Sequence, residues 1–206
     1  MRKTILLSAL TVLVFTSCQK QPKADFTMSK SECYVGETVT FTDKSVDAKS
    51  YNWSVDNIEK GTSTSVNYTT EESGVKIVKL ETFSKNGKKS NSNTKTLTVK
   101  NQNEAYFGYY FGDANSGCQV TDLDVNTLGS SQISFDFGGI PITASVNSLT
   151  SATLISSIFT DTDGTEYYIS GGNIIRNGNQ LTITVNFTVY YTDGTNASNS
   201  CTSIFN

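Results

Sequence analysis

Residues 180–191 read Gln-Leu-Thr-Ile-Thr-Val-Asn-Phe-Thr-Val-Tyr-Tyr, so polar and apolar side chains alternate along almost the whole stretch. Successive side chains of a β-strand point to opposite faces, and the alternation places Leu181, Ile183 and Val185 on one face and the threonines on the other. The stretch therefore predicts a long strand with one buried face and one solvated face.

The same pattern surrounds this strand throughout the C-terminal half. Seven further candidate strands are Ala105–Phe111, Cys118–Val125, Ser131–Phe137, Ile140–Val146, Thr153–Phe159, Thr165–Ser170 and Ser200–Phe205. Hairpin turn signals lie between several of them, at Asp163-Gly164, Asn177-Gly178 and Asp193-Gly194. Successive hairpins predict an up-and-down antiparallel meander that either closes as a barrel or folds as a sandwich.

The N-terminal half also consists of short strands. Apolar residues stand two apart in Val39–Phe41, Tyr51–Val55, Val66–Tyr68, Val78–Leu80 and Leu97–Val99, and turn signals separate these segments at residues 35–37, 59–61, 72–74 and 86–87. Short strands at this spacing predict a small sandwich. No stretch after the N-terminus sustains a period of 3.6 residues, so we expect an all-β chain with almost no helix.

The motif order in the N-terminal half resembles that of the PKD domain, an immunoglobulin-like module of extracellular proteins. The resemblance rests on Ala24-Asp25-Phe26, the stretch from Val35 to Ser45 (Val-Gly-Glu-Thr-Val-Thr-Phe-Thr-Asp-Lys-Ser), Tyr51-Asn52-Trp53, Val66-Asn67-Tyr68, Gly74 with Val78-Lys79-Leu80, and Thr94–Val99. It implies a seven-stranded sandwich over residues 24–100 with Trp53 in its core. Where the family usually has a Gly-Asp-Gly turn after the Trp, this chain has Asp56-Asn57, so no function of that turn is implied.

A looser resemblance concerns the C-terminal half. Gly108–Cys118, the strand beginning at Gln180 and the late Cys201 are similar to an uncharacterised β domain that often follows PKD modules in lipoproteins of Gram-negative bacteria. This resemblance implies an architecture and no activity.

The first eighteen residues have the order of a secretion signal. Arg2 and Lys3 precede the uncharged apolar run Ile5–Phe15, which would reach only about 17 Å as a helix, too short for a hydrocarbon core of about 30 Å. The small residues before Cys18 resemble the bacterial lipobox, which implies a diacylglycerol on Cys18 and cleavage just before it. An ordinary signal peptide with Cys18 free, or an uncleaved anchor, stays open as the alternative.

Lipidation at Cys18 would anchor the chain to a membrane of the bacterial cell envelope. Because Gln19 rather than Asp follows the Cys, and Asp there resembles the inner-membrane retention signal, we expect the outer membrane. Which side of that membrane carries the protein is left open.

The charge distribution indicates two domains. Residues 19–103 contain 13 Lys and 10 acidic residues, whereas residues 104–206 contain one Arg and nine acidic residues. We therefore expect a signal peptide at 1–17, a lipidated tether at 18–23, the PKD-like domain at 24–100, a linker at 101–103 and an acidic β domain at 104–206. The acidic half disfavours nucleic acid as a partner, because counterion release needs Lys and Arg.

The chain contains no His, which excludes the Ser-His-Asp and Cys-His nucleophile systems and removes the commonest metal ligand. We expect neither an enzyme nor a cofactor. In an oxidising compartment Cys118 and Cys201 are the expected disulfide, closing a loop of roughly 83 residues that is worth about 4–5 kcal/mol. Cys33 is then expected as a buried apolar thiol in the N-terminal domain, with a mixed disulfide pairing as the alternative.

Carboxylates gather in two places without a clear chemistry. Asp161, Asp163 and Glu166 have a spacing that starts a calcium loop, but the remaining ligands are missing and a hairpin turn is favoured over a weak Ca²⁺ site. Asp122, Asp124 and Asp136 provide carboxylates for glycosidase chemistry only if a cleft brings two of them together, and we expect them to face solvent.

Paired tyrosines are the most suggestive feature for function. Alternation turns one member of each consecutive pair away from the core, so these side chains predict an aromatic platform for a sugar ring or an apolar partner: Tyr106, Tyr109, Tyr110, Tyr167, Tyr168, Tyr190 and Tyr191. Packing under a loop, a neighbouring domain or a second copy is the alternative. The predicted function is a binding or adhesion module for a glycan or protein, with the PKD-like domain as spacer; a structural subunit of an envelope assembly is the alternative.

Overall fold

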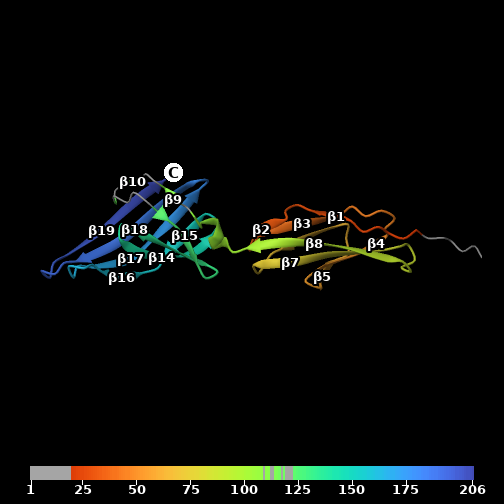
Figure 1. The fold of residues 1–206 in the computed structure, drawn as a ribbon, viewed down its shortest axis with the longest axis horizontal. Coiled ribbons are helices and arrows are strands. Elements are labelled where there is room, and N and C mark those ends of the chain that lie inside the picture. Colours follow the sequence, from red (N-terminus) through yellow and green to blue (C-terminus); the bar gives the residue numbers. More distant parts are fainter. Residues whose placement is uncertain (1–19, 109, 112–113, 117, 119–122) are drawn as a thin grey trace, which may run out of the picture. The chain divides into compact units, whose positions relative to one another are not determined.

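The chain is all-β. The computed structural model describes residues 20–206 except 109, 112–113, 117 and 119–122, and its only helix within these residues is the single 3₁₀ turn Gln102–Ala105 (Figure 1). None of the described helical residues forms a span with the length and apolarity that crossing a membrane requires. The predicted signal peptide, Cys18 and Gln19 lie outside the described residues.

The described chain falls into two compact units. One contains residues 20–29, 40–68 and 76–96, and the other contains residues 30–39, 69–75 and 97–206. The hydrogen-bonded sheets separate at a different place, because every strand up to Lys100 pairs within two N-terminal sheets and every strand from Tyr110 onward pairs within two C-terminal sheets. The linker at residues 101–103 stays a prediction.

The N-terminal sheets have three and five strands. Their strands are β1 (Phe26–Met28), β2 (Glu32–Tyr34), β3 (Thr38–Asp43), β4 (Ser50–Val55), β5 (Ile58–Gly61), β6 (Ser65–Thr69), β7 (Gly74–Phe83) and β8 (Ser90–Lys100). The spatial orders are β1-β3-β6 and β2-β8-β7-β4-β5. Alternation buries one side of β3 and β4, with Val39, Phe41 and Trp53 inside, as the sequence pattern predicts.

Trp53 lies at the centre of the N-terminal core and is completely buried. Its ring meets Phe26 edge-on at 5.2 Å between centroids and lies roughly parallel to Phe41 at 5.9 Å. The indole Nε1–H donates to the carbonyl of Ser63 at 2.8 Å, so the one polar atom of the side chain is satisfied. The prediction that Trp53 is a core residue is confirmed.

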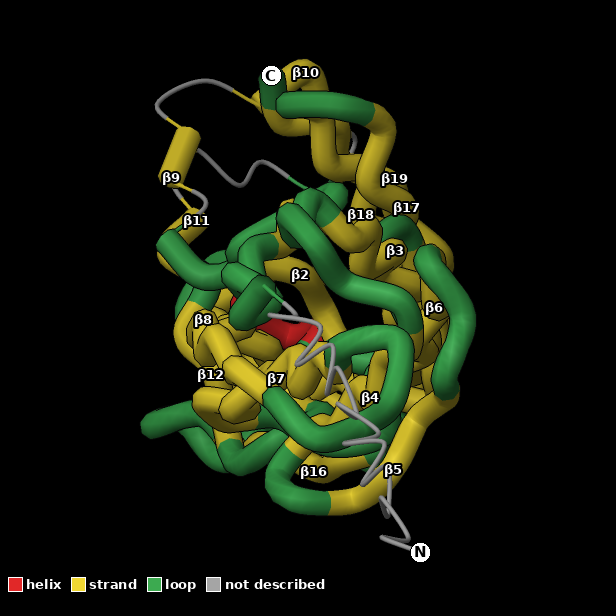
Figure 2. Tube along the Cα trace, turned by 90° about the vertical axis from the view of Figure 1, so that its right-hand side faces the viewer, coloured by secondary structure: helices red, strands yellow, loops and turns green. Residues whose placement is uncertain are grey.

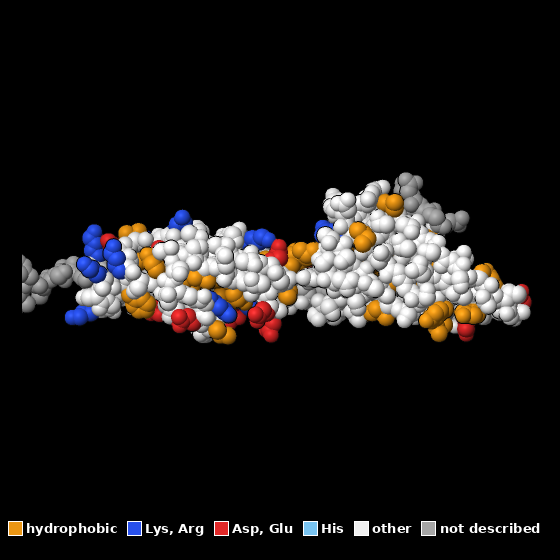
Figure 3. Space-filling model, turned by 180° about the vertical axis from the view of Figure 1, so that it is seen from behind, with side chains coloured by type: hydrophobic (Ala, Val, Ile, Leu, Met, Phe, Trp, Pro, Cys, Tyr) orange, Lys and Arg blue, Asp and Glu red, His pale blue; other side chains and the backbone are white. Residues whose placement is uncertain are grey.

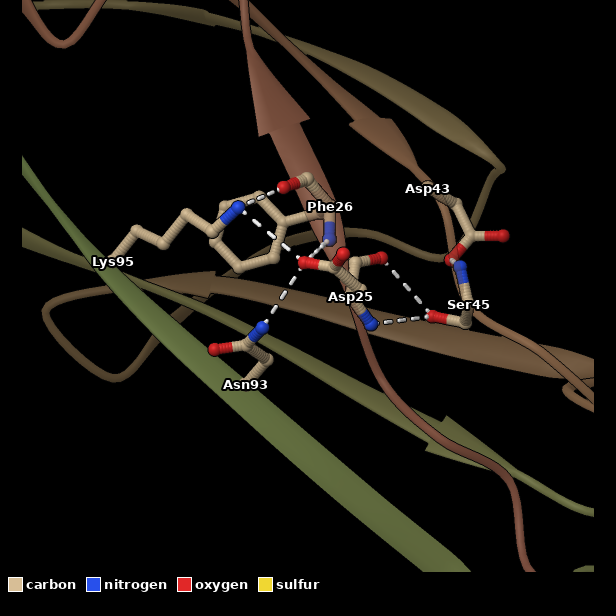
Figure 4. Close-up of polar contacts among 6 residues, drawn as sticks. All are labelled: Asp25, Phe26, Asp43, Ser45, Asn93 and Lys95. Atoms are coloured by element: carbon tan, nitrogen blue, oxygen red, sulfur yellow. Dashed lines mark hydrogen bonds and ion pairs between the residues drawn. The ribbon is translucent and has the colours of Figure 1, made fainter.

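A polar cluster beside the core ties β1 to β8 (Figure 4). Asp25 Oδ1 accepts from the backbone N–H of Phe26, from Asn93 Nδ2 at 3.2 Å and from Lys95 Nζ at 3.4 Å, and Lys95 also donates to the Phe26 carbonyl. The Phe26 N–H bond is the main reason that the pKa of Asp25 lies below its ordinary value, with the Lys95 hydrogen bond next. The cluster holds a strand of one sheet against a strand of the other.

The turn after Trp53 differs from the sequence prediction. Residues 59–61 were predicted as a turn, but Ile58–Gly61 is the strand β5, and the turn lies at Asp56 and Asn57, whose φ values are 50° and 67°. Asp and Asn tolerate this left-handed backbone, so they form a two-residue hairpin without Gly. β1, β2 and β5 add to the five strands that the apolar pattern predicted, so the described N-terminal half has eight strands where the resemblance implies seven.

The C-terminal half is built around one nine-stranded antiparallel sheet. Its spatial order is β10-β19-β18-β17-β15-β14-β13-β12, with β16 also paired to β17, and β9 and β11 form a separate two-stranded sheet. The strands are β9 (Tyr110–Phe111), β10 (Ala114–Ser116), β11 (Leu123–Asp124), β12 (Asn126–Leu128), β13 (Gln132–Phe137), β14 (Ile140–Ser148), β15 (Ser151–Leu154), β16 (Ser157–Thr160), β17 (Glu166–Asn177), β18 (Gln180–Tyr190) and β19 (Asn196–Phe205). Consecutive strands from β12 to β15 and from β17 to β19 are neighbours, which confirms the predicted meander. Figure 2 shows β17, β18 and β19 next to one another.

The longest hairpin, β17–β18, contains a bulge that the sequence did not predict. Gly171 and Gly172 ended the predicted strand at Ser170, whereas β17 continues through them, with the register shift between Ile169 and Gly171. A Cβ on Gly172 would lie 2.0 Å from the carbonyl oxygen of Thr184, and its φ is +145°. The two strands therefore approach each other at this point as only Gly allows.

Three other predicted strands of the C-terminal half are wrong in detail. Residues 153–159 contain the end of β15, a break at residues 155–156 and most of β16. Residues 105–111 contain the end of the 3₁₀ turn and a hydrogen-bonded turn at Tyr106–Gly108 before β9 begins, and the described part of residues 118–125 contains only the short β11. Tyr106 is completely buried and its hydroxyl donates to the Ser148 carbonyl at 3.2 Å. This aromatic residue fills the core because the turn directs it inward.

The predicted disulfide is confirmed. Cys118 and Cys201 are bonded, with their Cα atoms 5.5 Å apart and a sequence separation of 83 residues. Both half-cystines pack against the core of the C-terminal half. Cys33 is a free, buried thiol, and burial is the main cause that raises its pKa, so it is a weak nucleophile.

Candidate binding face

Three adjacent strands position the exposed aromatic residues of the C-terminal sheet. In the register of β16, β17 and β18, Tyr168 lies between Ile158 on one side and Thr188 on the other, and Tyr190 lies opposite Glu166. Tyr168 and Tyr190 are therefore diagonal neighbours, a relation that puts their Cα atoms about 7–8 Å apart, within reach of two aromatic side chains. We call these five residues the Tyr168 face.

The Tyr168 face is exposed and partly apolar. Figure 3 shows apolar side chains at the surface of this half of the chain. Ile158 is 67% exposed, Tyr168 39% and Tyr190 45%. Their neighbours along the strands, Tyr167 and Val189, point to the opposite side, where Val189 is buried and Tyr167 is half-buried against Phe159. Alternation therefore places Tyr167 and Tyr168 on opposite faces of the sheet.

Polar groups surround the apolar part of this face. The Thr188 hydroxyl shares a hydrogen bond of 2.9 Å with Ser198, which lies opposite it on β19, and the exposed Glu166 stands between the turn and Tyr168. The face therefore offers two phenol rings, one aliphatic side chain, hydroxyls and a single carboxylate. These are the groups that can stack against a ring and hydrogen-bond its substituents.

Two matching turns lie at the end of the face. The stretches Thr162-Asp163-Gly164-Thr165 and Thr192-Asp193-Gly194-Thr195 have the same sequence, and in each the Asp Oδ1 accepts the Thr backbone N–H, at 2.8 Å and 2.9 Å. A Cβ built on Gly164 would lie 3.3 Å from Thr192 Cγ2, so the turns are in contact.

The same hydrogen bonds stabilise the ionised form of the two turn carboxylates. The Thr165 backbone N–H lowers the pKa of Asp163, and the Thr195 hydroxyl, with its backbone N–H, lowers that of Asp193. Both carboxylates are therefore negatively charged acceptors at neutral pH.

The remaining predicted platform residues are not brought together on this face. Tyr106 is in the core, and Tyr167 faces the other side of the sheet. Tyr109 lies outside the described residues, and for Tyr110 the structure describes the strand but not the side chain. Tyr191 is 46% exposed at the start of the second turn. The sequence prediction also missed Ile158, which the period-2 pattern of residues 157–160 would have placed on the outer face.

The carboxylates that the sequence singled out are not assembled into a metal site. Within the described ranges, no three Asp, Glu, Cys or His side chains lie close enough together to hold a metal ion. Asp161 and Asp163 form the turn described above, Asp124 is exposed, and Asp136 is an exposed acceptor for the Gly139 N–H at 2.7 Å. Asp122 lies outside the described residues.

No family model and no curated protein matches the chain. Among solved structures, the chain is similar to one of carbohydrate-binding modules from the β-sandwich superfamily, with 17% identity, a TM-score of 0.39 and coverage of 90% of this chain and 91% of that one. It is also similar to fibronectin(III)-like modules of Clostridium thermocellum CbhA, with 8% identity, a TM-score of 0.34 and coverage of 87% and 91%. The three N-terminal domains of the bacteriophage RB49 outer capsid protein Hoc match at 11% identity and a TM-score of 0.30, over 88% and 68%. At these TM-scores none of the likenesses bears on function.

Proposed function

We propose that this protein is a lipid-anchored binding module of the bacterial envelope whose C-terminal sheet binds a glycan at the Tyr168 face. The observation that carries the proposal is the pair of exposed phenol rings, Tyr168 and Tyr190, which are diagonal neighbours on paired strands. A backbone fixed in an antiparallel ladder presents such rings with little entropy left to lose on binding. The PKD-like residues 24–100 act as the spacer between anchor and binding face.

The chemistry of the face favours a neutral sugar over a charged one. The apolar faces of pyranose rings stack on phenol rings, while the Glu166 carboxylate and the Thr188 hydroxyl accept and donate hydrogen bonds to sugar hydroxyls. Residues 104–206 contain one Arg and nine acidic residues, so an anionic glycan would be repelled. The proposed ligand class is therefore an uncharged oligosaccharide.

A glycan array probed with the full mature chain tests this proposal. We expect binding to neutral glycans, and the double variant Tyr168→Ala/Tyr190→Ala should weaken it at least tenfold, since two stacking surfaces are lost. Ile175→Ala is the matched control, because Ile175 is a 45% exposed apolar residue of the same strand, seven residues from Tyr168. Unchanged binding by the double variant, or equal loss in the control, would contradict a glycan site here.

The alternative is a structural subunit of an envelope assembly, and Ile158 is the observation in its favour. With 67% of its side chain exposed beside Tyr168, it extends the apolar part of the face, which a protein surface would cover. In that case the array gives no binding, and the Tyr168→Ala/Tyr190→Ala variant loses a partner protein that chemical cross-linking in the envelope captures with wild type.

The anchor is tested separately. We expect Cys18→Ser to stop the incorporation of labelled fatty acid and to release the protein from the outer-membrane fraction. If Cys18→Ser stays in the membrane fraction with residues 1–17 attached, the chain is held by an uncleaved segment instead. Neither outcome changes the glycan measurement, which uses the mature chain.

A further inference from the structure

The side of the C-terminal sheet opposite the Tyr168 face contains a cavity of about 290 Å³. The described residues that line it come from β13 and β14, from β17 to β19 and from the half-cystine before β11. They are Cys118, Phe137, Gly138, Ile140, Ile142, Tyr167, Ile169, Val185, Phe187 and Cys201.

The cavity has a buried floor and a partly exposed rim. Phe137, Ile142, Ile169 and Val185 are at most 6% exposed and form the floor. The rim consists of half-buried residues, namely Cys118, Ile140, Tyr167, Phe187 and Cys201. The disulfide is part of the rim, and since Cys201 lies opposite Val185 in the β18–β19 ladder, it fixes one wall next to the floor.

The described part of the lining disfavours a charged ligand group. None of the described lining residues carries a charge, and the only polar side-chain atom among them is the Tyr167 hydroxyl. Moving an ionised group from water into such surroundings without a partner costs several kcal/mol or more. The part of a ligand that enters the cavity therefore meets rings, aliphatic groups and one hydroxyl among the described side chains, which favours a neutral group over an ion.

The volume indicates the size of the ligand. A dry cavity of about 150 Å³ lined by Leu, Ile and Phe binds one benzene ring. The present cavity of about 290 Å³ is nearly twice as large, which matches a ligand of two rings. The floor and one wall are fixed by packing and by a disulfide, so the cavity has a defined shape. A rigid ligand of that shape loses less conformational entropy on binding than a flexible acyl chain of equal volume.

We propose that this cavity is a binding site for a neutral, rigid, two-ring apolar ligand, with the Cys118–Cys201 disulfide as one wall. The site is separate from the Tyr168 face, because the two lie on opposite sides of β17 and β18. It follows that each can be occupied or blocked without the other, and that reduction of the disulfide removes a wall of the cavity site and no residue of the Tyr168 face.

The experiment is a fluorescence titration of the full mature chain with 6-propionyl-2-(dimethylamino)naphthalene, a neutral probe with two fused rings. We expect saturable binding of one probe per chain and at least tenfold weaker binding by Ile140→Trp, which places a larger side chain at the rim. The reduced wild type and Cys118→Ala/Cys201→Ala should also bind at least tenfold more weakly. Tyr168→Ala/Tyr190→Ala is the matched control and should bind the probe as wild type does.

A second measurement needs no substitution and so does not depend on how a variant folds. Nuclear Overhauser contacts between the bound probe and the rings of Phe137 and Phe187 in the wild-type chain locate it in the cavity. Absence of saturable binding, contacts to Tyr168 instead, or wild-type affinity in folded Ile140→Trp each overturns the proposal. Loss of glycan binding by the Tyr168 variant with the probe still bound shows that the two sites are independent.

Discussion

Removal of the Cys118–Cys201 bond is predicted to destabilise the C-terminal half strongly. The closed loop of 83 residues restricts the unfolded chain, and the chain-entropy relation gives about 4.5 kcal/mol at 25 °C for a loop of this length. With a urea dependence of about 2 kcal/mol per molar, the midpoint of the C-terminal transition should fall by roughly 2 M in Cys118→Ala/Cys201→Ala.

The chain supplies its own internal reference for this measurement. Trp53 is the only Trp, and it is buried in the N-terminal core, so its emission follows that core while circular dichroism follows all strands. We expect Cys118→Ala/Cys201→Ala to lower the urea midpoint of the transition that circular dichroism detects and Trp53 emission does not. The matched control Cys33→Ala removes a buried thiol without opening a loop and should shift the Trp53 transition only slightly. A shift below about 0.5 M in the double variant, or an equal shift in Trp53 emission, would refute the loop-entropy reasoning.

Two further substitutions test the sheet itself. Gly172→Ala places a Cβ 2.0 Å from the Thr184 carbonyl oxygen and should lower the free energy of unfolding, measured in urea, by about 3 kcal/mol. Gly171→Ala is the control, with open space around its Cβ, and should lower it clearly less. Equal losses would contradict the close-approach argument. Asp163 and Asp193 have pKa values below their ordinary 3.8, so their turns contribute stability that is present above about pH 4 and is lost as the pH falls through the lowered values. Asp163→Asn/Asp193→Asn keeps both acceptors in uncharged form, and its thermal midpoint should depend less on pH between about 6 and 2 than that of wild type; an unchanged acid dependence would locate the effect elsewhere.

The strand content was predictable because burial in this chain follows the period of two. In β18 the residues Leu181, Ile183 and Val185 are buried in the order that the sequence indicates, and the same holds for Trp53 and Val55 in β4. The disulfide was predictable because the C-terminal half contains only two cysteines, Cys118 and Cys201, one near each end. These features depend on local pattern and composition, which a single sequence contains.

The errors arose where one residue type serves two backbone geometries. Gly171 and Gly172 read as the end of a strand, yet they form a bulge within β17, because Gly is favoured in both. The chain turns at Asp56-Asn57 without Gly, whereas the turn was predicted at residues 59–61 because Gly61 lies there. Such choices depend on the partner strand, which the local sequence does not specify.

The candidate site was predicted in part for the same reason. Alternation requires that one Tyr of each pair faces outward, but which one does depends on the register with β16 and β18. The register selected Tyr168 and Tyr190 and added Ile158. The cavity on the other side was not predictable, because it is formed by strands that lie far apart in sequence.

The two identical turns give this protein a built-in comparison between local and global stability. The amides of Thr165 and Thr195 make the same bond to an Asp at nearly the same length, 2.8 Å and 2.9 Å, yet Thr165 is buried and Thr195 is exposed. If the bond alone governed hydrogen exchange, the two protons would exchange with deuterium at the same rate. Slower exchange of the Thr165 amide would therefore measure the protection that burial under the sheet adds. The Thr195 amide, which makes the same bond in an exposed turn, gives the reference rate.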